Sequence, residues 1–167
     1  MIEVERVHHL GIRVIDEQQA IDFYRHFGFE VERRADGDDV TILTNPSGVE
    51  INLIYNGVDL TGGKNILMDV PEKHPGYTHV ALAVGSINRT LKALKESNIA
   101  ISQGPVTFGR KGYASVFVRD PDRNVIELRG RYTDEENVEG LERYDPKGPS
   151  YSLKRVGRNR AWRSVVD

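Results

Sequence analysis

The chain has 167 residues and no cysteine, with 29% charged residues and a formal net charge of -2 at pH 7. This length suits one core of ordinary size, and the lack of thiols excludes disulfides, thiolate catalysis and thiolate metal ligation. The charge balance argues against a nucleic acid or an anionic membrane as partner and favours a small-molecule substrate. Neither a signal-peptide pattern nor a membrane-length apolar run is present, so we expect a cytoplasmic protein.

The first elements in chain order predict a strand, a helix and three further strands. Residues 7–14, VHHLGIRV, indicate a short buried strand that opens with a polar residue. Residues 16–29 predict a helix whose apolar face is formed by Ala20, Ile21, Tyr24 and Phe27. Strand-like runs follow at 29–35 and 38–44, and the Asn-Pro turn of NPSGVEINL (45–53) leads into a last strand.

The same order then repeats. YTHVALAV (77–84) places His79 where the first copy has His9. The rest of the second copy comprises a helix at 86–99, strands at 99–109 and 112–119, and the turn and strand DPDRNVIEL at 120–128. Gly28 and Asn98 follow the two helices at equivalent positions and suit a left-handed C-cap. Each copy is therefore predicted to be a βαβββ module.

The chain is thus predicted to be an α+β protein with one domain over residues 1–130. Module one covers about 6–56 and module two about 77–130, joined by an ordered crossover loop. Residues 131–167 form a C-terminal extension outside the modules. In its second part four apolar residues interleave with basic ones and predict docking on the body or on a second subunit: Tyr151, Leu153, Val156 and Trp162.

Paired modules, with a histidine opening the first strand of each and DPDRNVIEL closing the second, resemble the vicinal oxygen chelate superfamily. That superfamily includes glyoxalase I, extradiol dioxygenases, fosfomycin-resistance transferases and metal-free bleomycin-resistance proteins. The resemblance covers about residues 6–130. It implies that the two sheets form an open half-barrel around a divalent metal, and that the protein is a homodimer.

The resemblance also implies the metal ligands. His9 and His79 take the two first-strand positions and Glu127 takes the last-strand position of module two, whereas module one has Asn52 there. Two imidazoles and one carboxylate suit Fe(II), Mn(II), Ni(II) or Zn(II). Glu50 would face the same side as Asn52, because side chains alternate along a strand, and a bulge would make it the ligand instead.

Three residues are candidates for binding substrate. Arg13 shares the inward face with His9, and a guanidinium there needs an anionic partner, either a substrate carboxylate or phosphate or an internal partner such as Glu50. In glyoxalase I, an arginine and an asparagine at the positions of Arg13 and Asn56 hold glutathione. Tyr113, near the mouth of a hairpin in module two, is a further candidate.

The candidate catalytic residues are Glu50, Asn52 and Glu127. An amide cannot take a proton from carbon, so Glu50 or Glu127 must move protons while Asn52 hydrogen-bonds or coordinates weakly. Dioxygenases of the family have a tyrosine where this chain has Phe117. We therefore expect a metal-dependent enzyme of glyoxalase (lyase or isomerase) or dioxygenase type. The alternatives are a fosfomycin-type transferase and a metal-free binding protein of the bleomycin-resistance kind.

Overall fold

A computed structural model of the chain describes residues 1–109, 112–135 and 137–145. The chain divides into two compact units. Met1–Gly62 contains module one, and Gly63–Asp167 contains most of the link, module two and the extension. The tail residues for which the sequence predicts docking, between Tyr151 and Trp162, lie outside the described residues. Among the helices that are described, none has the length and apolar character needed to cross a bilayer.

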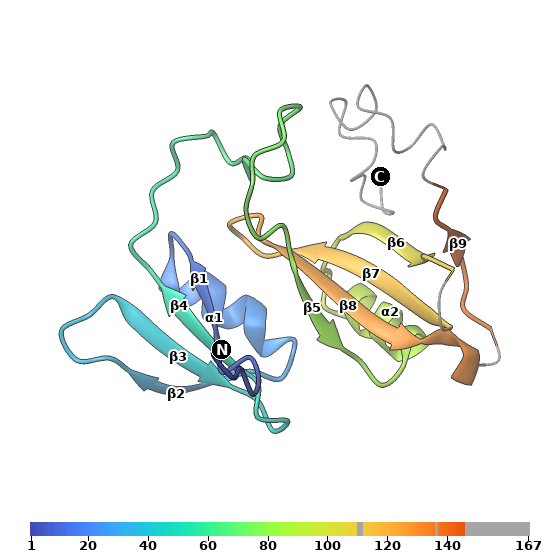
Figure 1. The fold of residues 1–167 in the computed structure, drawn as a ribbon, viewed down its shortest axis with the longest axis horizontal. Helices are drawn as coiled ribbons and strands as arrows, with labels where there is room; N and C mark the ends of the chain where they lie inside the picture. Colours follow the sequence, from blue (N-terminus) through green and yellow to red (C-terminus); the bar gives the residue numbers. More distant parts are fainter. Residues whose placement is uncertain (110–111, 136, 146–167) are drawn as a thin grey trace. The chain divides into compact units, whose positions relative to one another are not determined.

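Module one has the predicted βαβββ order (Figure 1). Its elements are β1 (Leu10–Arg13), α1 (Glu17–Arg25), β2 (Glu30–Arg34), β3 (Val40–Thr44) and β4 (Glu50–Ile54). The strand order is β1-β4-β3-β2, in which β1 runs parallel to β4 and the other pairs are antiparallel. Asp16 caps α1 by accepting a hydrogen bond from the Gln19 N–H, and Gly28, with φ of 79°, follows the helix in the predicted left-handed conformation.

Module two repeats the order and adds a strand. Its elements are β5 (Val80–Ala83), α2 (Ile87–Glu96), β6 (Ile101–Thr107), β7 (Tyr113–Arg119), β8 (Val125–Arg131), a 3-10 turn (Tyr132–Asp134) and β9 (Glu142–Arg143). The strand order is β5-β8-β7-β6-β9. Asn98, with φ of 54°, ends the helical segment as Gly28 does in module one. The predicted α+β fold of two βαβββ modules is confirmed.

Each sheet packs one face on its own helix, as Figure 1 shows for α2 against β7 and β8. Side chains alternate across a strand, so on β4 Ile51 and Leu53 are buried beneath α1 while Glu50 and Asn52 point to the other side. We call that other side the open face of each sheet. In module one it carries Arg13, Glu50 and Asn52, and in module two it carries Ser115, Glu127 and Arg129.

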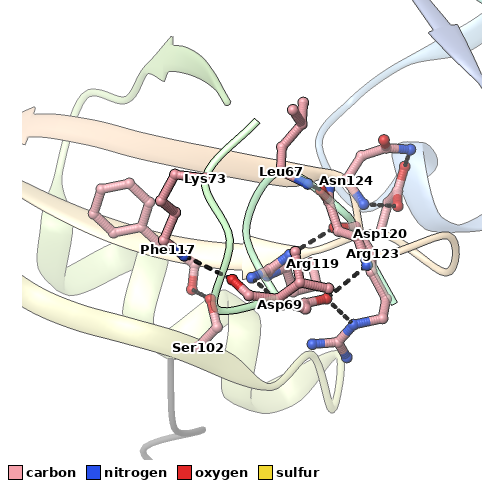
Figure 2. Close-up of polar contacts among 11 residues, drawn as sticks. Leu67, Asp69, Lys73, Ser102, Phe117, Arg119, Asp120, Arg123 and Asn124 are labelled. Carbon is pink, nitrogen blue, oxygen red and sulfur yellow. Dashed lines mark hydrogen bonds and ion pairs between the residues drawn. The ribbon is translucent and has the colours of Figure 1, made fainter. Parts of the chain in front are cut away.

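The link between the modules is anchored on module two by the buried side chain of Asp69. Its carboxylate accepts hydrogen bonds from Arg119 Nη2 at 2.9 Å, from Arg123 Nε at 2.7 Å and from the Asn65 N–H at 2.8 Å (Figure 2). Asn65 Nδ2 also donates to the Arg123 carbonyl at 3.1 Å. The link therefore has a fixed attachment at the β7–β8 turn.

The first part of the predicted extension is also attached to module two. Strand β9 adds to the edge of the sheet beside β6, and the Glu135 carboxylate accepts hydrogen bonds from the N–H groups of Ile87 (2.6 Å) and Asn88 (2.9 Å) at the start of α2. Burial raises the pKa of Glu135, but these N–H donors and Ser86 lower it more, so its net pKa lies below the usual value. Glu135 is thus an anionic cap supplied from outside the helix.

Candidate metal centre

The two predicted ligands of module two are in direct contact. His79 stands immediately before β5 and Glu127 lies within β8, which pairs with β5 in parallel and places Ala81 opposite Glu127. His79 Nε2 lies 3.1 Å from Glu127 Oε2. The His79 side chain is 38% exposed and that of Glu127 is 8% exposed. A buried carboxylate therefore lies beneath an imidazole that solvent can reach.

The other carboxylate oxygen of Glu127 is held by two neighbours on the open face. Ser115 Oγ donates a hydrogen bond to Glu127 Oε1 at 2.5 Å, and Arg129 Nη1 donates to the same oxygen at 3.0 Å. Arg129 Nη1 also lies 3.0 Å from Ser115 Oγ. Antiparallel pairing of β7 and β8 sets Ser115 opposite Arg129. Because Oε1 is engaged in this way, Oε2 is the oxygen presented to His79.

The His79 ring is oriented from its other side. Thr78 Oγ1 lies 3.0 Å from His79 Nδ1, and the ring meets Phe117 edge-on with centroids 5.9 Å apart. A partner on one ring nitrogen selects the tautomer and leaves the other nitrogen for a ligand, as in metal-bound histidines. Nε2 is thereby directed to Glu127.

Module one places a second group of donors around His9. His9 Nδ1 lies 3.9 Å from Glu50 Oε1 and 3.1 Å from His8 Nδ1. His8, His9 and Glu50 each offer a ligand atom within 4.8 Å of the others. Strict strand alternation would put His8 on the face opposite to His9, as a packing or surface residue. Its exposed ring nevertheless lies beside His9, because no strand has yet begun at this point of the chain.

Strand register makes Asn52 the positional equivalent of Glu127. Gly11 lies opposite Asn52 in module one, just as Ala81 lies opposite Glu127 in module two, and the β1–β4 register has no shift. The β1–β4 pair therefore has no bulge that would place Glu50 instead of Asn52 at the ligand position. Asn52 Oδ1 is buried and has no hydrogen-bond partner within the described part of the chain. A buried acceptor of this kind is costly unless something donates to it or coordinates it.

The predicted substrate-binding residues lie at strand ends. Arg13 is the last residue of β1, and exposed Asn56 follows β4, where the Gly57 N–H donates to the Val14 carbonyl at 3.0 Å. The ion-pair contact of Glu50 is with His9 and not with Arg13. Arg13 thus stays a candidate for binding a substrate anion.

Tyr113 begins β7, on module two. Its ring lies beneath the guanidinium groups of Arg129 and Arg131, at 5.3 Å and 5.7 Å from the ring centroid. A hydrogen bond with Tyr113, and then Asp134, raise the pKa of Arg131 above its usual value. The Tyr113 ring therefore packs against two guanidinium groups and is not an isolated polar residue.

Comparison with known proteins identifies the family. Residues 6–128 match the sequence profile of the Glyoxalase/Bleomycin resistance protein/Dioxygenase superfamily. The chain belongs to this superfamily. Its members bind small molecules, and they include glyoxalase and dioxygenase enzymes.

Particular superfamily proteins are similar over most of the chain. A glyoxalase domain-containing protein, RDO1 of Mycosarcoma maydis, is 32% identical over 130 residues, which is 76% of this chain and 69% of the relative. The structure of a glyoxalase/dioxygenase from Nostoc punctiforme aligns with a TM-score of 0.58 at 25% identity and covers 75% of this chain and 90% of that one. Lactoylglutathione lyase from Agrobacterium tumefaciens shares the fold, with a TM-score of 0.55, 16% identity and coverage of 76% and 94%.

The residues of this superfamily member fit a divalent cation. Two nitrogen or oxygen ligands at about 2.0–2.2 Å from one ion, at right or tetrahedral angles, lie about 2.8–3.6 Å apart. The distance of 3.1 Å between His79 Nε2 and Glu127 Oε2 is in that range. Within module one, Asn52 Oδ1 is likewise a buried oxygen with no hydrogen-bond partner among the described residues. The donors are nitrogen and oxygen, which suits Fe(II), Mn(II), Ni(II) or Zn(II).

Two supporting residues were missed by sequence reasoning. Ser115 and Arg129 are ordinary strand residues in the sequence, and their role appears only when β7 is paired with β8. Strand alternation was the one available signal, because Arg129 follows Glu127 by two positions and must share its face.

Ser115→Ala is expected to weaken metal binding by about 10- to 100-fold, the usual cost of losing a partner that orients a ligand. Without the hydroxyl, Oε1 keeps only Arg129, and the carboxylate of Glu127 is less well fixed. Titration of metal-free protein with Zn(II), followed by calorimetry, measures the effect. Ser47→Ala, in the exposed turn before β4, is the matched control and should bind as wild type does. Equal affinity of the Ser115 variant and wild type would contradict the supporting role.

Proposed function

We propose that the protein is a metal-dependent enzyme of the superfamily in which His9, His79 and Glu127 are ligands of one divalent cation. The proposal rests on the contacts of the two carboxylate oxygens of Glu127. One oxygen of this buried carboxylate is fixed by Ser115 and Arg129, and the other faces His79 at 3.1 Å. Proteins hold first-row metal ligands in this way, with outer partners that orient the ligating atoms.

The proposed substrate is small and rich in oxygen, and two of its oxygens would bind the cation. A bound cation would supply Lewis-acid polarisation of those oxygens. Arg13 and Asn56, at neighbouring strand ends, bind and orient an anionic end of the substrate. The same residues hold the reacting carbon in a fixed position, so that proton transfer occurs within one complex.

Glu50 is the proposed proton carrier. Its carboxylate lies on the open face, is 24% exposed, and stands 3.9 Å from His9. Asn52 has no basic group and instead offers its unpaired Oδ1 as an acceptor. Phe117, at the family's tyrosine position, is a buried ring with no hydroxyl to assist ring cleavage. These features support a glyoxalase-type lyase or isomerase over a dioxygenase.

Elemental analysis of protein purified without chelators tests the proposal. Stoichiometric divalent metal is the expected result, and a lack of oxygen uptake with catechols would agree with a lyase or isomerase. Protein that neither retains metal nor binds added Fe(II), Mn(II), Ni(II) or Zn(II) would contradict the enzyme. It would favour a metal-free binding protein of the bleomycin-resistance kind.

The roles of Glu50 and Asn52 can be separated by their effects on metal affinity. Asn52→Asp keeps the side-chain shape and adds a negative charge, and we expect it to lower the metal dissociation constant by about tenfold, since affinity follows the charge of the ligand set. Glu50→Gln removes a carboxylate two residues away and should leave the constant within a few-fold of wild type. Calorimetric titration with Mn(II) measures both. Loss of binding in Glu50→Gln would instead make Glu50 a ligand.

A further inference from the structure

Arg129 lies on the open face of module two with hydrogen-bond donors that Glu127 and Ser115 do not use. It lies two residues beyond Glu127 on β8, and its side chain is 36% exposed. Its hydrogen bonds within the described residues, to Glu127 and Ser115, both use Nη1. A guanidinium carries five N–H donors in a planar fork, so most of the fork remains for another acceptor. The Tyr113 ring supports the group from below at 5.3 Å.

The balance of charge around Arg129 would change if Glu127 bound a cation. The Glu127 carboxylate lies 3.0 Å from Arg129 Nη1 and balances the positive charge of the guanidinium. If that carboxylate bound a divalent ion, its single negative charge would be shared between the ion and the Arg129 guanidinium. The neighbouring Arg131 is different, because Asp134 Oδ2 pairs with its Nε at 3.1 Å. Metal loading therefore leaves Arg129 with positive charge that an anion from solution can balance.

The position of Arg129 fits an anion carried by the substrate. Residues i and i+2 of a strand are about 6.5–7 Å apart and point to the same side. A small molecule whose oxygens reach the cation at Glu127 can thus extend a second group along β8 to Arg129. Oxyanions such as carboxylate and phosphoryl groups match the arginine fork, which can donate two parallel hydrogen bonds to them.

We propose that Arg129 is a specificity-determining residue that binds a carboxylate or phosphoryl group of the metal-chelating substrate. The inference rests on the proposed function, and it adds a recognition point on module two to the Arg13 and Asn56 pair of module one. It defines the substrate class as a bidentate oxygen chelator with an oxyanion a few bonds from the chelating oxygens.

Three hydroxamates test this inference with the metal-loaded full chain. Acetohydroxamate has no charged group besides its chelating oxygens, whereas succinohydroxamate adds a carboxylate and phosphonoacetohydroxamate adds a phosphonate. We expect the anionic probes to bind wild type about tenfold or more tightly than acetohydroxamate, as measured by calorimetry with Zn(II)-loaded protein. The better of the two anionic probes identifies the oxyanion.

Variants assign the effect to one side chain. Arg129→Gln is expected to bind the probes with the added carboxylate or phosphonate about as tightly as acetohydroxamate, so that the affinity ratio falls close to one. Arg129→Lys should retain part of the ratio. Arg131→Gln removes an equal charge two residues further along β8 and should keep the wild-type ratio. Comparing probes within each variant cancels any change in metal affinity that follows from the contact of Arg129 with Glu127.

An unchanged affinity ratio in Arg129→Gln overturns the inference alone. If Arg13→Gln then lost the ratio, the anion would bind to module one. Failure of all three hydroxamates to bind protein shown to contain metal would overturn the proposed function as well, because no open chelating position would then exist.

Discussion

His79→Ala is expected to remove the divalent cation from the purified protein. The variant loses the imidazole whose Nε2 lies 3.1 Å from Glu127, and with it one of three proposed ligands. Loss of a partner outside the coordination sphere already costs about 10- to 100-fold in affinity, so loss of a ligand should raise the dissociation constant by more than that. Elemental analysis and calorimetric titration of the same preparation give the result.

His74→Ala is the matched control for this change. His74 is an exposed residue of the link, five positions before His79, and its replacement should leave the metal content unchanged. His8→Ala provides the opposing test. If His79→Ala kept its metal and His8→Ala lost it, the cation would belong to the His8, His9 and Glu50 group of module one, and the proposed ligand set would be wrong.

Asp69→Asn is expected to lower the free energy of unfolding by about 3–5 kcal/mol, the cost of breaking a buried ion pair from one side. The Asp69 side chain is 3% exposed and that of Arg119 is 10% exposed, so the substitution removes the carboxylate that pairs with a buried guanidinium. Figure 2 shows Asp69 between Arg119 and Arg123. Urea denaturation of metal-free protein measures the loss. Asp134→Asn, which breaks a surface ion pair, should change stability little.

The ion pair of Asp69 with Arg119 also makes the free energy of unfolding depend on pH. Burial raises the pKa of Asp69, but hydrogen bonds from Arg123 and the Asn65 N–H, together with both arginine charges, lower it more, so the folded pKa lies below 3.8. A depressed pKa contributes stability above the unfolded value and loses it as the pH falls through the folded value. The difference between wild type and Asp69→Asn should therefore shrink below about pH 4. A constant difference from pH 7 to pH 3 would contradict this account.

The fold could be predicted closely because its signals are local and occur twice. The apolar spacing of Ala20, Ile21 and Tyr24 predicts a helix face that is buried, and the left-handed positions of Gly28 and Asn98 follow the two helices as expected. Turns before β4 and β8 lie at the Asn-Pro and Asp-Pro pairs. Short-range patterns suffice here, because each module folds its own helix onto its own sheet.

The candidate site was predictable only in part. The repeat aligns His9 with His79 and Asn52 with Glu127, and the β1–β4 and β5–β8 registers confirm that alignment of positions. Nothing in the local sequence distinguishes Ser115 from other strand serines. Its contact with Glu127 depends on how β7 pairs with β8, and strand register is a property of two segments that meet only in the folded chain.

The two βαβββ modules, the resemblance to the superfamily and the residues at the four equivalent positions could all be predicted from the amino-acid sequence. The folded chain was needed to show that one oxygen of Glu127 is fixed while the other faces His79, that Arg129 lies beside the same carboxylate, and that Asp69 anchors the link. These two groups of features differ in the sequence separation of the residues that produce them. Periodicity and turn chemistry act over a few residues, whereas burial, hydrogen-bond partners and charge balance arise from segments far apart in the chain.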